Sequence, residues 1–339
     1  MSKITTEEST VPNAHMGLAS VFRGPGQPLE CQPFALPELD AGEILVGITC
    51  CTICGSDLHT YQGHRDTPTP TVLGHEIIGQ VVKLGPGRPV CDIEGKPLEL
   101  GDLVTWSIAA SCGICFYCRH GIPQKCESLF KYGHEPIQPA HPFSGGLAEY
   151  CHLAVGTAIA RIPENVPIDV ACPANCATAT VAAALRMAGE CEDQTILIQG
   201  SGMLGVAACA MAQWQGARAV IATDIDPQRL AWAKRFGANQ CVPAREEAHA
   251  LRRVVEDATN GRGVDIAIEL SGDRSAIPLG LDSLRVGGRY ILVGAVFPGA
   301  PVPIDVEQVV RRLLSIRGVH NYAPDDLAAA LRFLSANHH

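Results

Sequence analysis

The segment "CGICFYCRHGIPQKC", residues 112–126, places four cysteines within fifteen positions. Four thiolates can fill the coordination sphere of a zinc ion, and such a closed site holds a loop in place but binds no substrate. An iron–sulfur cluster and disulfide bonds are the alternative uses of such a set. In a reducing compartment, the spacing of Cys112, Cys115, Cys118 and Cys126 favours metal ligands over disulfide bonds.

A second group of possible metal ligands is more widely spaced. Cys54 in "CTICGSDLHTY" and His75 in "TVLGHEIIGQ" are 21 residues apart and bracket strand-forming sequence, and Cys176 lies in "NCATAT". Two thiolates and one imidazole suit zinc, and three protein ligands leave its fourth position open. An open position permits Lewis-acid chemistry on an alcohol oxygen, so the group predicts a catalytic zinc site.

A glycine-rich turn predicts a dinucleotide site. In "ILIQGSGMLGVA", Gly200, Gly202 and Gly205 form G-x-G-x-x-G between a predicted strand and a predicted helix, where backbone amides can meet a pyrophosphate. Asp224 ends the next strand, "AVIATD", 19 residues after Gly205. A carboxylate there accepts ribose hydroxyls and repels a 2′-phosphate, which favours NAD over NADP. Arg229 either contacts the adenosine ribose or lies on a solvated helix face.

The elements that must position these residues fall into two parts. Residues 15–110 contain β-branched runs separated by glycine and proline turns, which predicts a β-rich domain. From about residue 177, short apolar strands alternate with helices, the last of these helices being predicted over "RSAIPLGLDSLRVGG". This alternation predicts an α/β domain with a doubly wound parallel sheet. The boundary is expected near residue 175.

Length and charge limit the function classes. The 339 residues are enough for two domains, and an apolar content of 47% supplies their cores. The net charge of −9 argues against nucleic acid or an anionic membrane as the main partner. The polar start "MSKITTEEST" has no secretory core, and "VACPANCATATVAAALRMAG" contains Pro173, Asn175 and Arg186, which make it a poor membrane span. These features predict a cytoplasmic protein.

Several motifs occur together in one order: "CGSDLHTY", "GHEIIG", the four-cysteine lobe, "GSGMLG" and "ELSG…LRVGGRYILVG". Over about residues 15–335 the chain resembles the zinc-dependent medium-chain dehydrogenases, the group of alcohol, sorbitol and threonine dehydrogenases. The resemblance implies a GroES-like catalytic domain over 1–175, with the structural-zinc lobe at about 108–130, and a Rossmann NAD-binding domain over 176–319. It implies an NAD-dependent zinc alcohol dehydrogenase with two zinc ions per chain.

The resemblance also implies roles for individual residues. Ser56 takes the proton of the alcohol, and His59 passes it toward solvent; a turn-capping serine and an exposed loop histidine are the alternatives. Asp57 orients His75, and Glu76 lies behind the metal, where it can transiently coordinate it; a buried structural acceptor is the alternative for both carboxylates. Cys176 rather than Cys172 falls at the third ligand position. The dinucleotide-binding motifs further include Met203, Leu204, Ser271 and Gly294.

The substrate is predicted only by class. Phe130 and Tyr132 are candidate apolar walls of its pocket, and Lys131 and His134 are candidate anchors for a charged group; for each of the four, a plain residue of the lobe is the alternative. A similarity to the phosphonate-catabolism-associated branch implies a hydroxyalkyl phosphonate or a related, polyol-like alcohol. We expect a homo-oligomer, a dimer or tetramer. Relatives usually continue beyond "FLSANHH", so residues 320–339 are expected to begin a truncated return to the catalytic domain.

Two rival functions remain open. The first is a zinc-free reductase of activated double bonds from the same superfamily, which would need neither Cys54 nor the cysteine lobe. The second is a non-catalytic nucleotide-binding protein that keeps zinc only as a scaffold. Zinc content separates the three hypotheses: two ions per chain favour the dehydrogenase, one favours the scaffold, and none favours the reductase.

Overall fold

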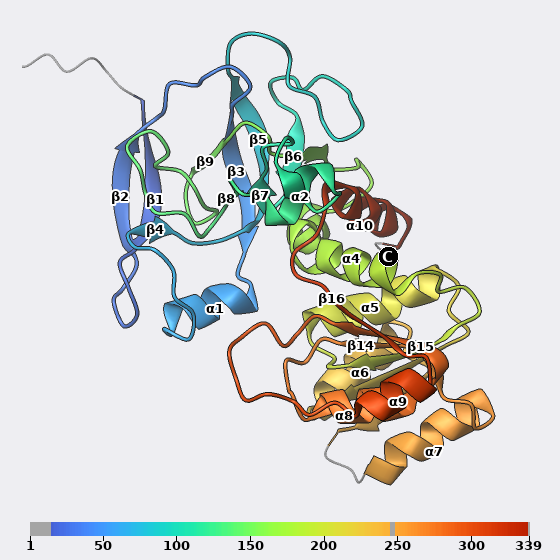
Figure 1. Cartoon of the computed structure of the whole chain (residues 1–339). Helices are drawn as coiled ribbons and strands as arrows, with labels where there is room; N and C mark the ends of the chain where they lie inside the picture. Colours follow the sequence, from blue (N-terminus) through green and yellow to red (C-terminus); the bar gives the residue numbers. More distant parts are fainter. Residues whose placement is uncertain (1–14, 245–247, 338–339) are drawn as a thin grey trace, which may run out of the picture.

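Antiparallel strands dominate the N-terminal half of the chain in the computed structural model, which describes residues 15–244 and 248–337 (Figure 1). One sheet has the strand order β2-β1-β4, a larger one has the order β10-β6-β5-β3-β9, and β7 pairs with β8. The elements are β1 (Met16–Phe22), β2 (Glu30–Ala35), β3 (Ile44–Thr52), α1 (Gly55–Tyr61), β4 (Thr71–Val72), β5 (Glu76–Leu84), β6 (Leu103–Trp106), β7 (Ala109–Ala110), α2 (Phe116–Arg119), η1 (Pro123–Lys125), β8 (Phe130–Lys131), β9 (Tyr150–Leu153) and β10 (Ile159–Arg161).

The five-stranded sheet has a buried aliphatic face. Ile44 and Val46 on β3 and Ile77 and Val81 on β5 are almost completely buried, together with Trp106 at the end of β6. Burying each of these aliphatic side chains stabilises the fold by about 1.5–3 kcal/mol. The antiparallel pairing of β3 with β5 ends at Thr52 opposite Glu76, so the residues just beyond this pair are held close together.

The C-terminal half contains the predicted doubly wound parallel sheet, whose six strands run β13-β12-β11-β14-β15-β16. The direction of winding reverses between β11 and β14, where such sheets bind ligands at the carboxyl ends of the strands. The elements are α3 (Ile168–Ala171), η2 (Cys172–Asn175), α4 (Ala177–Ala188), β11 (Thr195–Gln199), α5 (Met203–Trp214), β12 (Ala219–Asp224), α6 (Pro227–Arg235), β13 (Gln240–Pro243), α7 (Ala248–Thr259), β14 (Val264–Glu269), α8 (Ala276–Ser283), β15 (Leu284–Leu292), α9 (Val306–Arg311), β16 (Ser315–Gly318) and α10 (Pro324–Asn337).

One helix prediction is wrong at its end. The helix expected over "RSAIPLGLDSLRVGG" stops at Ser283, and β15 begins at Leu284, which pairs with Val264. The residues that follow include a β-branched valine and two glycines, all of which are poor helix formers. Strand pairing with β14 therefore replaces the last helical turn.

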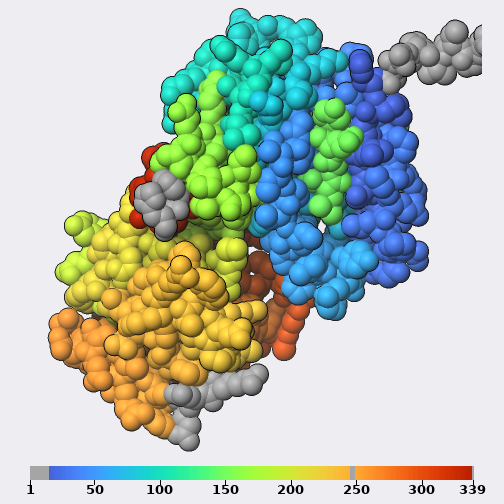
Figure 2. All heavy atoms as spheres, turned by 180° about the vertical axis from the view of Figure 1, so that it is seen from behind, coloured from blue at the N-terminus to red at the C-terminus, as the bar shows by residue number. Residues whose placement is uncertain are grey.

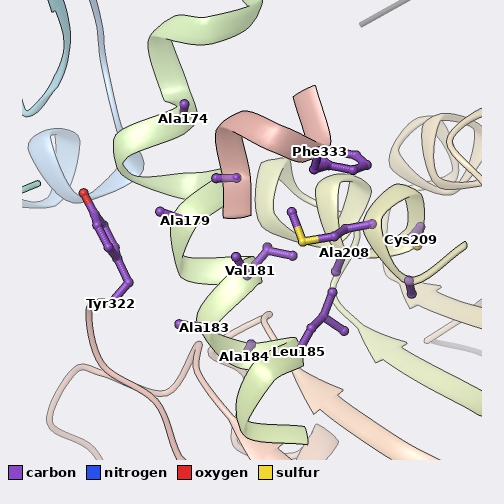
Figure 3. Close-up of a cluster of buried hydrophobic side chains, with 14 of the residues drawn as sticks. Ala174, Ala179, Val181, Ala183, Ala184, Leu185, Ala208, Cys209, Tyr322 and Phe333 are labelled. Carbon is purple, nitrogen blue, oxygen red and sulfur yellow. The ribbon is translucent and has the colours of Figure 1, made fainter. Parts of the chain in front are cut away.

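Helix α4 joins the two halves. Val181 and Leu185 point toward α5 and α10, whereas Ala179 and Ala183 lie on the side of α4 that faces Tyr322 (Figure 3). Phe333 of α10 lies in this core and contacts Trp214 of α5 edge to face, with ring centroids 5.6 Å apart. Tyr322, just before α10, accepts a hydrogen bond from Ile108 N and donates one to Asn175 O. The C-terminal segment thus contacts the N-terminal half.

The surface is hollowed between the two halves, and Figure 2 shows this cleft between the blue N-terminal strands and the yellow and orange parallel-sheet unit. It is a cavity of about 740 Å³ lined from both sides. Among the described helices, none alone has the length and apolar content of a membrane span, although the bent pair Ile168–Asn175 and Ala177–Ala188 does when taken together.

Candidate active site

The three widely spaced ligand candidates come together in the cleft. Cys54 is the residue before α1, His75 directly precedes β5, and Cys176 directly precedes α4. Their ligand atoms all lie within 4.8 Å of one another, and the two sulfur atoms are 3.8 Å apart. The end of the β3–β5 pair at Thr52 and Glu76 explains why Cys54 and His75 are neighbours despite their distance in sequence.

The donor set fits a zinc ion. Two thiolates bound to a tetrahedral zinc at about 2.3 Å would lie about 3.8 Å apart, which matches the separation of Cys54 and Cys176. The hydrogen bond from Cys176 lowers the pKa of Cys54 to about 3 against the opposing effect of burial, and the same bond raises the pKa of Cys176. The two sulfurs therefore share one proton, which a divalent cation would displace.

The imidazole of His75 is oriented by Asp57. Asp57 Oδ1 lies 3.1 Å from His75 Nδ1, and Asp57 Oδ2 accepts a hydrogen bond of 3.0 Å from Cys54 N. Burial lowers the pKa of His75, but the hydrogen bonds to Asp57 and Cys54 outweigh it and raise the pKa to about 9. Ser56 Oγ is 3.3 Å from His75 Nε2. One carboxylate thus holds one candidate ligand by its ring and another by its backbone.

The three candidate ligands Cys54, His75 and Cys176 are called the metal group below. Residues behind the metal group connect it to the sheets. Asn175 is fully buried; its side-chain amide donates to His75 O and Trp106 O, both at 3.0 Å, and its oxygen accepts from Ile77 N at 3.3 Å. Glu76 Oε2 accepts a hydrogen bond of 2.5 Å from Thr52 Oγ1, and burial raises the pKa of Glu76. Sequence reasoning did not find Asn175, because an amide beside a cysteine has no motif of its own.

Cys172 takes a different position from Cys176. Its sulfur lies 3.7 Å from Thr52 Oγ1 and donates to the carbonyl oxygen of Glu76 at 3.3 Å. Burial raises its pKa to about 12, which keeps the thiol protonated. Of the two cysteines, the structure therefore brings Cys176 to Cys54 and His75.

The four cysteines of the lobe form a second group whose sulfurs all lie within 4.8 Å of one another. Backbone amides donate to these sulfurs: Cys112 N to Cys126 Sγ at 3.2 Å and Cys115 N to Cys112 Sγ at 3.4 Å. All cysteines are free thiols, and the 3.9 Å between Cys115 Sγ and Cys126 Sγ is far longer than a disulfide bond. Sulfurs this close fit a single ion, with no room for a cluster of several iron atoms.

The glycine-rich turn lies at the carboxyl end of β11. Gly200 has φ +94°, and a Cβ on Gly205 would lie 1.9 Å from the carbonyl oxygen of Gly200, so neither position admits a side chain. A Cβ on Gly202, the residue before α5, would meet nothing within 4 Å. Asp224 at the end of β12 accepts hydrogen bonds from Ser201 N at 2.7 Å and Asp226 N at 2.9 Å.

A neighbouring turn is held by Glu269, which sequence reasoning missed. This carboxylate is fully buried at the end of β14 and accepts hydrogen bonds from Ser271 Oγ, Gly272 N, Gly294 N and Ala295 N at 2.6–3.1 Å. It thereby fixes two of the predicted cofactor-binding positions, Ser271 and Gly294, across the switch point of the sheet. A lone glutamate at a strand end gives no sequence signal for this role.

The remaining predicted cofactor residues differ in position. Leu204 and Gly294 line the cleft. Met203 at the start of α5 is 63% exposed, and Arg229 on α6 is directed toward Asp226, the residue before that helix, with 3.9 Å between nitrogen and oxygen. Arg229 therefore lies on a solvated helix face in the structure, which was the alternative to a contact with the ribose.

The cleft also receives His59, Lys131 and His134, whereas two predicted wall residues are elsewhere. His59 stacks at a tilt on Phe297 of the parallel-sheet unit, with ring centroids 4.7 Å apart. Tyr132 is fully buried in the β-domain core, and Phe130 packs on that core, so the prediction for both is wrong. Arg65 and His320 line the cleft without having been predicted, since neither belongs to a motif.

A third group of ligand-type side chains, Glu43, His141 and His152, lies in the β-domain and does not line the cleft. The Glu43 carboxylate accepts hydrogen bonds from Asp40 N and His152 Nε2, both at 2.9 Å. These bonds explain Glu43 as a structural acceptor.

Residues 40–164 match the family model "Alcohol dehydrogenase GroES-like domain", and residues 204–336 match "Zinc-binding dehydrogenase". The chain is 33% identical over 294 residues to L-threonine 3-dehydrogenase of Anaeromyxobacter dehalogenans, covering 84% of this chain and 78% of that protein. It is 33% identical over 310 residues to the enzyme of the same name from Burkholderia thailandensis, covering 89% and 83%.

Two solved structures have the same overall fold. The alcohol dehydrogenase of Thermotoga maritima has a TM-score of 0.91 and 30% identity, with 96% of this chain and 90% of that chain covered. The alcohol dehydrogenase of Thermus sp. ATN1 has a TM-score of 0.82 and 28% identity, with 94% and 89% covered. These similarities extend over both the β-rich half and the parallel-sheet half.

Proposed function

The chain belongs to the zinc-dependent medium-chain dehydrogenase family, and from that premise we propose that it transfers hydride reversibly from an alcohol to NAD. The enzyme is an oxidoreductase acting on CH–OH groups. One observation carries the proposal: Cys54, His75 and Cys176 line the same cleft as Leu204 and Gly294 of the predicted dinucleotide site. A metal-activated alcohol and a hydride acceptor can therefore meet.

The chemistry divides between bound groups and side chains. Cys54, His75 and Cys176 would hold a zinc ion, which would supply Lewis acidity toward an alcohol oxygen, and a bound nicotinamide would supply the hydride acceptor. Ser56 lines the cleft beside His75, and its Oγ takes up the hydroxyl proton. His59 is half-buried at the same wall and passes the proton toward solvent, a role that suits an imidazole near neutral pH.

Asp57 and Glu76 act from behind these groups. Asp57 keeps His75 Nδ1 engaged, which directs Nε2 into the cleft as a ligand. Glu76 is buried next to the ligand His75, and its carboxylate accepts a hydrogen bond from Thr52. We propose it as the carboxylate that supports the metal from behind. Four further thiolates, Cys112 to Cys126, would hold a structural zinc, which gives two zinc ions per chain.

The preference for NAD rests on Asp224. Its carboxylate is buried at the end of β12 beside the glycine-rich turn, where a 2′-phosphate would be repelled. We expect kcat/KM with NAD to exceed that with NADP by at least tenfold. A preference for NADP would contradict the assignment of Asp224.

The finer features extend the same proposal. The substrate is a hydroxyalkyl phosphonate or a polyol-like alcohol, as the branch resemblance implies. The protein is cytoplasmic and acts on a small molecule, with neither nucleic acid nor a membrane as partner. It assembles as a homo-oligomer, a dimer or tetramer, because symmetric oligomers are the common state of soluble enzymes.

An alcohol panel tests the proposal directly. The purified full chain is assayed for NADH absorbance with and without a chelator, and its zinc content is measured. We expect two zinc ions per chain and an activity that the chelator removes. Cys54→Ser is expected to lose one zinc and at least 99% of the activity, whereas Cys31→Ser, at an exposed cysteine of β2, keeps both.

Two results would contradict the proposal. A chain with one zinc ion that oxidises no alcohol and reduces no carbonyl would favour the scaffold hypothesis. Chelator-insensitive reduction of activated double bonds would favour the zinc-free reductase.

A further inference from the structure

Two cationic side chains enter the cleft beside the candidate zinc ligands. Arg65 lies in the segment after α1 and Lys131 on β8, and both line the cavity that contains Cys54, His75 and Cys176. Neither was assigned a partner by the mechanism above. Their position raises the question of what negative charge they meet.

The fold directs Lys131 into the cleft. Its neighbours Phe130 and Tyr132 pack on or within the β-domain core, and Tyr132 OH hydrogen-bonds Thr157 Oγ1 at 2.6 Å. Because successive side chains of a strand point to opposite faces, Lys131 faces away from that core. Its backbone is held by pairing with Ala109 and by a 2.9 Å bond from Lys131 N to the carboxylate of Glu135.

These cations lack carboxylate partners. Within residues 15–244 and 248–337, neither Arg65 nor Lys131 forms an ion pair, whereas Lys83 and Lys96 pair with glutamates on the surface. Asp66 also lines the cleft but is exposed and pairs with neither of them. Exposed lysines rarely need a partner, but side chains within a cleft lose solvation and do.

The remaining opposite charges belong to the metal group. Burial, with the neighbouring cations Arg65 and Lys125, lowers the pKa of Lys131 to about 8, so its ammonium is still mostly protonated at pH 7. The charges that oppose this are those of Cys176 and Cys54. The nearest carboxylate charge for Arg65 is that of Asp57, whose two oxygens are already engaged by His75 Nδ1 and Cys54 N. Two thiolates and a divalent cation would sum to zero, so within the described residues Arg65 and Lys131 are cations of the cleft that no carboxylate binds directly.

The histidines of the cleft do not change this balance. Burial and the neighbouring cations lower the pKa of His134 to about 2 and that of His320 to about 4, so both are neutral at pH 7. His320 Nδ1 instead accepts a hydrogen bond of 2.6 Å from Lys125.

We propose that the cleft selects an alcohol that also carries an oxyanion, either a carboxylate or a phosphonate or phosphate, and that Arg65 and Lys131 bind this oxyanion. The inference rests on the proposed dehydrogenase function and names the substrate class for the same site. The guanidinium of Arg65 can form two parallel hydrogen bonds to an oxyanion, and the ammonium of Lys131 adds a point charge. Binding the anion there places the substrate beside the metal group while its hydroxyl carries out the reaction.

The test compares three alcohols of similar size with the zinc-loaded full chain: 3-hydroxypropionate, 2-hydroxyethylphosphonate and the neutral 3-hydroxypropionamide. We expect kcat/KM for at least one anion to exceed that for the amide by at least tenfold. Lys131→Gln and Arg65→Gln are each expected to reduce this ratio about 10- to 100-fold, because hydrogen bonds to charged groups are lost. Lys131→Arg retains the preference, and Lys96→Gln, at an exposed surface lysine, does not change it.

A binding measurement separates substrate selection from chemistry. Methylphosphonate and propionate, which have no hydroxyl, are titrated calorimetrically, and we expect Lys131→Gln and Arg65→Gln to weaken at least one by about tenfold. Whichever of methylphosphonate and propionate binds more tightly shows whether the site prefers a phosphonate or a carboxylate. Equal kcat/KM for the amide and both anions would overturn the inference and leave the dehydrogenase function standing. Oxidation of none of the three, nor of any panel alcohol, would overturn the proposed function itself.

Discussion

Asp57→Asn is the sharpest test of how the metal group is built. Asp57 is buried, and its two oxygens serve two candidate ligands, His75 through the ring and Cys54 through the backbone amide. An asparagine has one acceptor oxygen and an NH2 group that can only donate. The substitution therefore removes one of the two hydrogen bonds, together with a negative charge, without changing the size of the side chain.

The expected magnitude follows from these two contacts. Removing the carboxylate partner of a metal-bound histidine costs about 10- to 100-fold in metal affinity, or about 1.4–2.7 kcal/mol. Cys54 N is one of the amides at the start of α1 that have no acceptor within the helix backbone, and it donates to Asp57 instead. Losing this acceptor costs about 1 kcal/mol of folding stability in the metal-free protein. The zinc affinity of the three-ligand group is thus expected to fall more than the stability.

Competition with a chromophoric chelator measures the first quantity, and urea unfolding of the metal-free protein measures the second. Asp193→Asn, at a side chain that is 81% exposed, is the control and leaves both unchanged. The four-cysteine lobe supplies an internal reference, because its zinc is expected to bind equally in both variants. A zinc affinity of the Cys54 group within threefold of the parent would refute the role given to Asp57.

Three further predictions follow from buried contacts and charge. Asn175→Ala leaves two carbonyl groups and one amide without their partner, so urea unfolding should show a loss of about 3 kcal/mol; a loss below about 1 kcal/mol would contradict the bridging role. Gly205→Ala brings a Cβ to 1.9 Å from Gly200 O and lowers Tm, whereas Gly202→Ala keeps Tm but weakens NAD binding measured by fluorescence, and the reverse pattern would contradict the turn geometry. The pKa of Lys131 is lowered to about 8, so its charge is present below that pH and lost above it; KM for 3-hydroxypropionate should rise from pH 8 to 9 while KM for the amide does not, and parallel profiles would count against Lys131.

Local patterns were enough to predict the dinucleotide turn. Gly200, Gly205 and Asp224 are recognisable because the strand–turn–helix unit imposes its own steric limits within a few residues. The same holds for the cysteine lobe, whose four sulfurs lie within fifteen positions and need no distant segment to meet. Where one short segment makes a site, residue types and spacing describe the site well.

The cleft wall could not be predicted in this way. Strand β8 has only two residues, which is too short for an alternation of apolar and polar residues to predict whether Phe130 or Lys131 faces the core. The sequence suggested Phe130 and Tyr132 as apolar walls, but pairing with Ala109 and the bond between Tyr132 and Thr157 turn both aromatic rings away. Arg65 was missed for a related reason, since its place in the cleft depends on packing across the domain seam.

The metal group itself depends on that seam. Cys54 and His75 lie next to the ends of β3 and β5 of the antiparallel sheet, whereas Cys176 directly precedes α4, which packs into the core shared with α5 and α10. A metal bound by all three would therefore tie the two halves together. The protein also supplies its own connection, because Asn175 joins His75 to the start of α4 and Tyr322 joins Asn175 to Ile108. Since these hydrogen bonds need no metal, we expect the cleft to be formed before zinc binds, so that removing zinc abolishes activity while leaving the fold intact.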